Sequence, residues 1–288
     1  MALAQADDPD AQMPMPFALA EQYAQQVMAW SRALHPGSAD VDIQLDQRYG
    51  DRRLQRFNVF SPKGATQAPM LIFWHGGGWT NGYRAYVHFM AAHVARMGFV
   101  LVAPSYRLAP ADRLPAAIDD AIACATFVAQ HAHRYGGNGS SIVLSGHSAG
   151  AHLATMVALR SPSALKHHVR ACLPISGIMD LHHPSPAPGS LEERVYTLLL
   201  ADAAQDAVMS PMAWCAGNTL PFELTVGEHD SERVRSSNRR FAALLQAQGA
   251  IGHLHIEPAH NHFQTHTMLT DPAHPWYARL AAYRPVQP

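Results

Sequence analysis

The sequence is poor in several features, and each shortage excludes a class of protein. Only 15% of its 288 residues are charged and the formal net charge is -1, so no excess of one sign favours binding to nucleic acid or to an anionic membrane. The three cysteines are too few and too widely spaced for a disulfide framework or a cysteine zinc site. We therefore expect reduced cysteines and small-molecule partners, with no nucleic-acid or membrane partner.

Long apolar runs are missing as well. No stretch is long enough to cross a bilayer, and Asp7, Asp8 and Asp10 lie where a secretory signal would be basic and then apolar. The sequence therefore predicts a cytoplasmic protein. Nineteen histidines raise the alternative of a metal site, but their spacing matches no HExxH or Cys/His motif, so we expect no metal and no other cofactor. The oligomeric state stays open, with a homodimer as one alternative.

Apolar residues are abundant, and their spacing predicts the fold class. They make up 48% of the chain, enough for the core of one domain over residues 1–288. Helical spacing over residues 17–34 predicts an N-terminal helical extension within residues 1–35. Alternation at 41–46 and 54–60 predicts two half-buried antiparallel strands.

From residue 69 onward, short continuous apolar runs alternate with helical segments. This alternation predicts a mostly parallel central sheet with helices on both faces, the α/β class. Proline and glycine in DLHHPSPAPGS, residues 180–190, exclude helix and strand. The segment 191–209 then has a helical pattern, but no strand follows at once. We expect residues 181–218 to form a small cap insertion over the carboxyl edge of the sheet. The helices are expected near 84–97, 113–134, 149–160, 232–248 and 263–270.

The run GHSAG, residues 146–150, lies between an apolar strand and a helix. A GxSxG run in this setting is typical of a nucleophile elbow, a sharp strand-to-helix turn that exposes the central serine. We therefore predict Ser148 as a nucleophile. The alternative is an ordinary glycine-rich turn with a capping serine.

The run HGGGW, residues 75–79, directly follows the apolar run PMLIFW. Acyl transfer passes through an oxyanion that needs backbone N–H donors, one from the residue after the nucleophile and one from the loop after an earlier strand. Glycines let the backbone approach the reacting centre closely. We predict an oxyanion hole formed by Gly77, Gly78 and Ala149.

A serine nucleophile needs a base, and the base needs an orienting carboxylate. In this class of fold the acid and the histidine follow later strands, in that order. Asp230 and Glu228 follow the strand near 220–227, and His262 and His260 follow the strand near 252–258. We select Asp230 and His262 because each stands just ahead of a helix. Glu228 and His260 stay as competitors, and a helix cap and a solvated loop histidine are the structural alternatives.

Several runs together resemble the kynurenine formamidase (arylformamidase) branch of the α/β-hydrolases, from about residue 70 to 270. The runs are HGGGW, PSYRLAP, GHSAGAHLATM, SGIMDL, VGEHDSERVRSSNRRFAALLQAQG and HNHF. The resemblance implies the α/β-hydrolase fold with Ser148, Asp230 and His262 as its triad. Hormone-sensitive-lipase-like esterases share the HGGG and YRLAP runs, but they typically have Asp and Gly where this chain has His147 and Ala151. Asn261 departs from the branch, which usually has an acidic residue before its histidine.

The residues and the resemblance together imply a serine hydrolase that cleaves an aryl formamide or a carboxylic ester through an acyl-enzyme. A general short-chain carboxylesterase of the hormone-sensitive-lipase-like type is the alternative, and a non-catalytic binding protein derived from a hydrolase is a remote one. Trp79, Tyr83 and Tyr106 lie near the expected site and are predicted to stack on an aromatic leaving group. The alternative for these three is packing at the rim.

Overall fold

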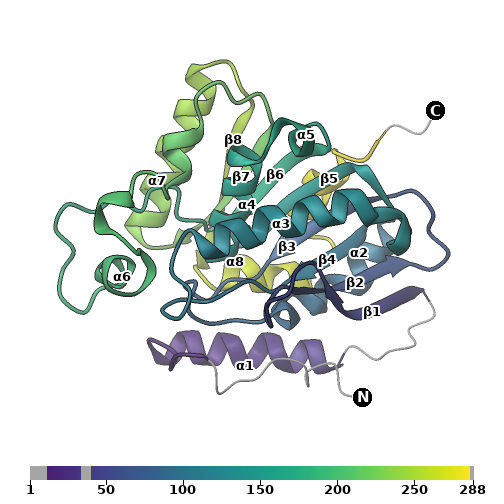
Figure 1. The fold of residues 1–288 in the computed structure, drawn as a ribbon, viewed down its shortest axis with the longest axis horizontal. Coiled ribbons are helices and arrows are strands. Elements are labelled where there is room, and N and C mark those ends of the chain that lie inside the picture. Colours follow the sequence, from purple (N-terminus) through teal and green to yellow (C-terminus); the bar gives the residue numbers. More distant parts are fainter. Residues whose placement is uncertain (1–11, 34–39, 286–288) are drawn as a thin grey trace.

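An eight-stranded sheet forms the centre of the protein (Figure 1). The structure is a computed structural model that describes residues 12–33 and 40–285, so the remaining residues of the predicted 1–35 extension lie outside the described ones. The strand order is β1-β2-β4-β3-β5-β6-β7-β8. The strands are β1 (Val41–Arg48), β2 (Arg56–Pro62), β3 (Ala68–Trp74), β4 (Val100–Pro104), β5 (Gly137–His147), β6 (Val169–Ile175), β7 (Phe222–His229) and β8 (Gly252–Asn261).

The pairing directions follow the apolar patterns. β2 runs antiparallel to both β1 and β4, and every other neighbouring pair is parallel. Parallel strands end at the same edge, so β5, β7 and β8 deliver the residues that follow them to one side of the molecule.

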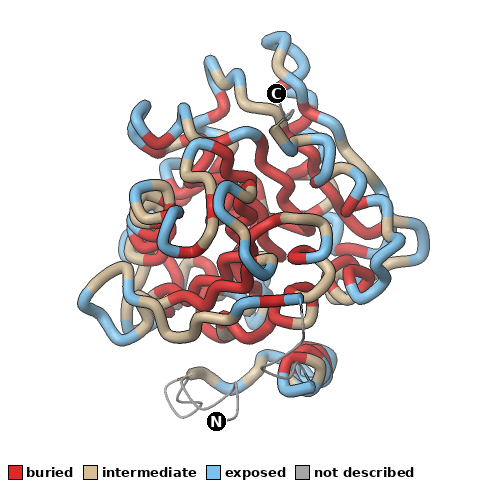
Figure 2. The backbone as a smooth tube through the Cα atoms, turned by 90° about the vertical axis from the view of Figure 1, so that its right-hand side faces the viewer, coloured by how far each residue is buried: buried red, intermediate tan, exposed pale blue. Residues whose placement is uncertain are grey.

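Helices cover both faces of the sheet, which is why its central strands are apolar on both sides. Ile72 of β3 belongs to the core beneath one set of helices, and its neighbour Leu71 belongs to the core beneath the other. Figure 2 shows the resulting buried interior under an exposed outer layer. One set is α3 (Ala116–His131), α4 (Ala149–Arg160) and α7 (Glu232–Ala247), and the other is η2 (Arg84–Met90), α2 (Ala91–Arg96), η7 (Met268–Thr270) and α9 (Pro275–Ala281).

A further helix, α1 (Ala18–Ala33), lies outside the second set and is the lowest element in Figure 1. Tyr23 and Val27 of α1 are buried and pack in one cluster with Tyr86 of η2. The apolar spacing predicted this helix, and its apolar stripe is the face that packs on η2. Every helix among the described residues is too short or too polar to cross a bilayer.

The segment expected as one helix over residues 191–209 is broken, so this prediction is wrong. It forms α6 (Leu191–Arg194), a π turn η4 (Val195–Leu199) and a 3-10 turn η5 (Ala203–Gln205), and a further 3-10 turn, η6 (Pro211–Trp214), follows the segment. Contacts with another loop explain the break. Leu200 pairs with Leu114 as an isolated bridge, and Arg113 donates to the carbonyl oxygens of Leu200 and Thr197, both at 2.8 Å. Leu200 is held in an extended conformation, with φ -80 and ψ 133, and this ends the helix.

Four short elements complete the described chain. α9 was not predicted. It begins at Pro275, and proline is favoured in the first turn of a helix. The predicted helix over 263–270 is present as a short α-helix followed by η7. The others are η3 (Ala132–Tyr135), α5 (Ser163–Lys166) and α8 (Gln264–Thr267).

Candidate active site

Ser148 lies on a strained turn between β5 and α4. Its backbone angles are φ 56 and ψ -118, a region that non-glycine residues rarely adopt. The turn packs tightly on β3, since a Cβ atom at Gly150 would lie 2.1 Å from the carbonyl oxygen of Trp74. Only glycine fits there. The sharp turn projects the Ser148 side chain into the pockets described below.

Three predicted side chains meet at this turn. His262 Nε2 lies 2.9 Å from Ser148 Oγ, and His262 Nδ1 lies 2.7 Å from Asp230 Oδ1. Ser148 follows β5, Asp230 follows β7, and His262 follows β8. The distances are those of hydrogen bonds, so a proton can pass from the hydroxyl to the imidazole while the carboxylate holds the ring.

The competing acid and base lie elsewhere. Glu228 is exposed, and its carboxylate accepts a hydrogen bond from the backbone N–H of Ala259 at 2.8 Å. His260 is half-buried, and its Nδ1 lies 2.7 Å from the carbonyl oxygen of Pro258. The structure therefore brings Asp230 and His262 to Ser148, whereas the side chains of Glu228 and His260 bond to the backbone of Ala259 and Pro258.

Asp230 is buried and held by two further donors. Ser176 Oγ donates to Asp230 Oδ2 at 2.6 Å, and the backbone N–H of Gly227 donates to the same oxygen at 2.8 Å. Burial alone would raise the pKa of Asp230, but hydrogen bonds from His262, Ser176 and Gly227 outweigh it and lower that pKa. The carboxylate is thus kept ionised beside the imidazole. Thr265 Oγ1 lies 2.8 Å from Ser176 Oγ and donates to the carbonyl oxygen of His262 at 2.7 Å.

The sequence analysis missed Ser176. It directly follows β6, the strand between β5 and β7, so it ends at the same edge of the sheet as the triad. Its φ of 49 is a second positive value at this edge. A small polar residue before a glycine at the end of a parallel strand was the available signal.

A buried histidine, His147, bonds to the backbone of His262. His147 Nε2 lies 2.7 Å from the carbonyl oxygen of His262, and since a carbonyl only accepts, this nitrogen carries the proton. Burial, then the nearby His262 and His266, lowers the pKa of His147 well below its usual value. His266 stacks on His147, and its Nδ1 is 2.7 Å from the hydroxyl of Tyr23 in α1. The N-terminal helix is thereby bonded to the layer under the site.

The glycine loop lies beside Ser148. Gly77 and Gly78 both line a pocket that Ser148 also lines, and Ala149 is the first residue of α4, where backbone N–H groups have no partner within the helix. Gly77 has a φ of 123, and a Cβ atom there would lie 2.0 Å from the carbonyl oxygen of Asn81. Side chains other than hydrogen are therefore excluded at Gly77.

Of the three aromatic residues predicted to contact substrate, one lines a pocket at Ser148 and two do not. Trp79 lines the larger pocket at Ser148, and its indole N–H donates to His152 at 3.3 Å. Tyr106 is fully buried behind the loop, where it stacks on His75 and donates to the carbonyl oxygen of His75 at 3.0 Å. Tyr83 packs edge-on against Tyr86 and lines neither pocket described below. Contact with substrate is therefore wrong for Tyr106 and unsupported for Tyr83. Both pack around the glycine loop instead.

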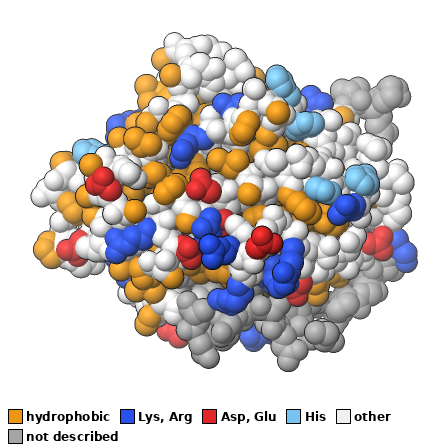
Figure 3. All heavy atoms as spheres, in the orientation of Figure 1, with side chains coloured by type: hydrophobic (Ala, Val, Ile, Leu, Met, Phe, Trp, Pro, Cys, Tyr) orange, Lys and Arg blue, Asp and Glu red, His pale blue; other side chains and the backbone are white. Residues whose placement is uncertain are grey.

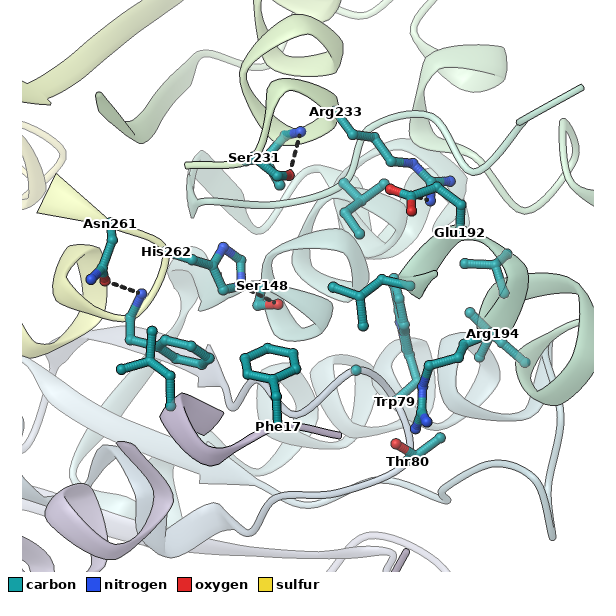
Figure 4. Close-up of a pocket in the computed structure, with 18 of the residues that line it drawn as sticks. Phe17, Trp79, Thr80, Ser148, Glu192, Arg194, Ser231, Arg233, Asn261 and His262 are labelled. Atoms are coloured by element: carbon teal, nitrogen blue, oxygen red, sulfur yellow. Dashed lines mark hydrogen bonds and ion pairs between the residues drawn. The ribbon is translucent and has the colours of Figure 1, made fainter. Parts of the chain in front are cut away.

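Ser148 and His262 line two pockets, and Figure 4 shows the larger of the two. The larger measures about 320 Å³ and extends between α6 and η4 on one side and Trp79 on the other, whereas the smaller measures about 120 Å³ and reaches toward α1. Apolar side chains dominate both. The larger pocket is lined mainly by Phe17, Leu19, Trp79, Ile178, Leu191, Val195, Leu199, Val234 and Phe263, and the smaller by Met15, Pro16, Phe17, Ala20, Tyr23, Tyr86 and Phe263.

Charged side chains of both signs lie on one face of the molecule. Acidic and basic side chains are interspersed on the face shown in Figure 3, which is the view of Figure 1. In the described part of the chain, no group of three or more His, Cys, Asp or Glu side chains is arranged to hold a metal ion.

Comparisons with known proteins give the family and the fold of the chain. Residues 57–241 match the family described as BD-FAE. Esterase LipQ of Mycobacterium tuberculosis is 27% identical over 68% of this chain and 51% of its own, so the chain spans about half the length of that relative. Carboxylesterase NlhH, from the same species, is 28% identical over 71% of this chain and 69% of its own. The structure of EstE1, a carboxylesterase from a metagenomic library, superposes with a TM-score of 0.76 at 22% identity, over 96% of this chain and 99% of EstE1. This last match confirms the α/β-hydrolase fold predicted from the sequence.

Proposed function

The chain belongs to the BD-FAE family, and from this membership we propose that it is a serine hydrolase that cleaves small carboxylic esters through an acyl-enzyme. The proposal rests on two consecutive hydrogen bonds, one of 2.9 Å between Ser148 and His262 and one of 2.7 Å between His262 and Asp230. Names of the relatives support the same class, since LipQ is an esterase and NlhH a carboxylesterase.

Acylation begins at the hydroxyl of Ser148. His262 Nε2 takes its proton while Oγ attacks the ester carbonyl, and Asp230 stabilises the imidazolium that forms. The carbonyl oxygen becomes an oxyanion, for which we assign the N–H groups of Gly77, Gly78 and Ala149 as donors. His262 then gives the proton to the leaving alcohol as the C–O bond breaks.

Deacylation repeats the sequence with water. His262 takes a proton from the water, the hydroxide oxygen attacks the acyl carbonyl, and Ser148 Oγ leaves with the proton returned by His262. All of these steps use groups that the described residues supply.

The shape of the site favours substrates of modest size. The pocket walls are mostly apolar, and Phe17, Leu19 and Leu191 are exposed at their edge. Apolar surface of this kind attracts the hydrocarbon parts of an ester. The two pockets offer separate spaces for the acyl and the alcohol parts on either side of Ser148.

Arylformamidase activity is the second candidate. It is favoured by the His147 and Ala151 that flank the serine, and by the aromatic rings of Phe17, Trp79 and Phe263 in the larger pocket. Such rings can stack on an arylamine leaving group. The same triad chemistry would apply, with the C–N bond of a formamide in place of the ester C–O bond.

One experiment tests both candidates. Wild type and Ser148→Ala would be assayed side by side on 4-nitrophenyl butyrate and on N-formylkynurenine, with equal thermal unfolding as the control for folding. We expect ester turnover that falls by about 10⁴-fold or more in the variant. Serine-dependent turnover of the formamide as the faster reaction would assign arylformamidase activity instead. Equal turnover in the two proteins would overturn Ser148 as the nucleophile, and no turnover of either substrate by wild type would leave the non-catalytic binding protein.

A further inference from the structure

Arg194, the last residue of α6 in the cap, lines both pockets at Ser148. It is half-buried, and its guanidinium has no hydrogen-bond or ion-pair partner among the described residues. In Figure 4 the side chain points down toward Thr80 and Trp79, on the far side of Ser148 from His262. The cap therefore presents an uncompensated positive charge to the space that a bound substrate would occupy.

The other charged groups of the larger pocket compensate one another. Glu192 lies 3.6 Å from Arg233, and Arg233 also donates to the carbonyl oxygen of Leu181 at 2.8 Å. With Glu192 and Arg233 paired, Arg194 leaves the lining with one surplus positive charge. A guanidinium that is partly withdrawn from water among apolar side chains is a strong site for an anion, because the apolar walls reduce competition from solvent.

We propose that Arg194 binds a carboxylate of the substrate, so that the preferred substrates are esters carrying a free carboxylate. The inference rests on the esterase function proposed above. A planar guanidinium suits a carboxylate because two parallel N–H···O bonds can form. The position across from His262 requires the carboxylate to lie apart from the scissile carbonyl, on either the acyl or the alcohol part.

Two matched substrate pairs separate these possibilities. The first pair, 3-acetoxybenzoate and 3-acetoxybenzamide, places the carboxylate or its neutral counterpart on the leaving group. The second pair, 4-nitrophenyl hydrogen adipate and its primary amide, places it on the acyl chain. Values of kcat/KM would be measured for wild type, Arg194→Gln and Arg194→Lys.

Arg239→Gln serves as the charge-matched control, since Arg239 lies on α7, is 52% exposed and lines neither pocket. It removes one positive charge without changing the site.

We expect wild type to prefer the carboxylate of at least one pair by roughly 10- to 100-fold, the range for a hydrogen-bonded charge. Arg194→Gln should abolish this preference through KM and leave the neutral ester little changed, and Arg194→Lys should retain part of it. The pair that responds identifies the part of the ester that carries the carboxylate.

Three results would overturn the inference. The first is that wild type shows no preference for the carboxylate ester. The second is that Arg194→Gln loses kcat/KM equally on the charged and neutral esters, and the third is that Arg239→Gln shows the same loss of kcat/KM as Arg194→Gln. Serine-dependent turnover of neutral esters without a carboxylate preference would refute this inference and leave the proposed function standing. No serine-dependent turnover of any ester would refute the proposed function, and the inference would fall with it.

Discussion

Replacement of Ser176 by alanine tests how the triad acid is held. Ser176 is fully buried and contacts neither pocket, but its hydroxyl donates to Asp230 at 2.6 Å. The substitution removes one of three hydrogen bonds to this carboxylate and one partner of Thr265. We therefore expect Ser176→Ala to misorient Asp230 and, through it, His262.

The size of the effect follows from the contacts that remain. A hydrogen bond to a charged group contributes about 1.5–3 kcal/mol. Asp230 Oδ2 keeps the N–H of Gly227 at 2.8 Å, so we expect the lower end of that range. If about 1.4 kcal/mol is lost from the transition state, kcat falls about tenfold. KM should change little, because Ser176 does not reach the substrate.

A second variant separates the hydroxyl from the backbone. Ser176 has a φ of 49, a conformation that costs non-glycine residues about 1–2 kcal/mol. Ser176→Gly removes the same hydroxyl but suits this backbone. Steady-state kinetics on 4-nitrophenyl butyrate and urea unfolding would be measured for both variants. Equal losses of kcat support the hydrogen bond as the cause, whereas wild-type kcat in both variants, or a loss in alanine alone, would refute the reasoning.

Two further substitutions test whether Glu228 could be the triad acid and how the stability of the fold depends on low pH. Glu228→Gln should keep wild-type kcat/KM, because this exposed carboxylate only caps Ala259; a large loss would reinstate Glu228 as the triad acid. Hydrogen bonding to His274, supported by Arg279, lowers the pKa of Glu257 to about 2 from an ordinary value of 4.5. The ionised Glu257 therefore stabilises the fold above about pH 4.5, and this stabilisation is lost as the pH falls toward 2. Glu257→Gln should therefore lower the free energy of unfolding by roughly 1 kcal/mol near pH 7, allowing for partial exposure, and by less near pH 3.5; a pH-independent cost in urea unfolding would contradict this.

The sequence predicted those parts of the site that come from local patterns. The elbow at Ser148 and the loop at Gly77 each combine a strand ending with glycines, and such a turn has few local conformations. Asp230 and His262 could be selected because parallel strands end at one edge. Their burial and contacts, which separate them from Glu228 and His260, depend on tertiary packing and could be seen only in the structure.

The pocket walls could not be predicted in the same way. Phe17 comes from the segment before α1 and Arg194 from the cap, and neither lies near a motif in the sequence. The segment 191–209 was predicted as one helix, and its break after Leu199 could not be foreseen, because residues 197–200 contact Arg113 and Leu114 in a distant loop. Tyr106 failed as a predicted contact for a related reason. Its place just after β4 predicted that it lies near the glycine loop, but not the direction of its side chain, which stacks on His75.

The bond between Tyr23 and His266 joins residues that are 243 positions apart. A ribosome adds about 5–20 residues per second, so α1 is synthesised roughly 10–50 s before its partner exists. During that interval the apolar stripe of α1 can reach η2 but not His266 or Phe263. The smaller pocket is therefore closed only after residues 262–266 have been synthesised, and a nascent chain that already holds Ser148 and its glycine loop still lacks one wall of the site.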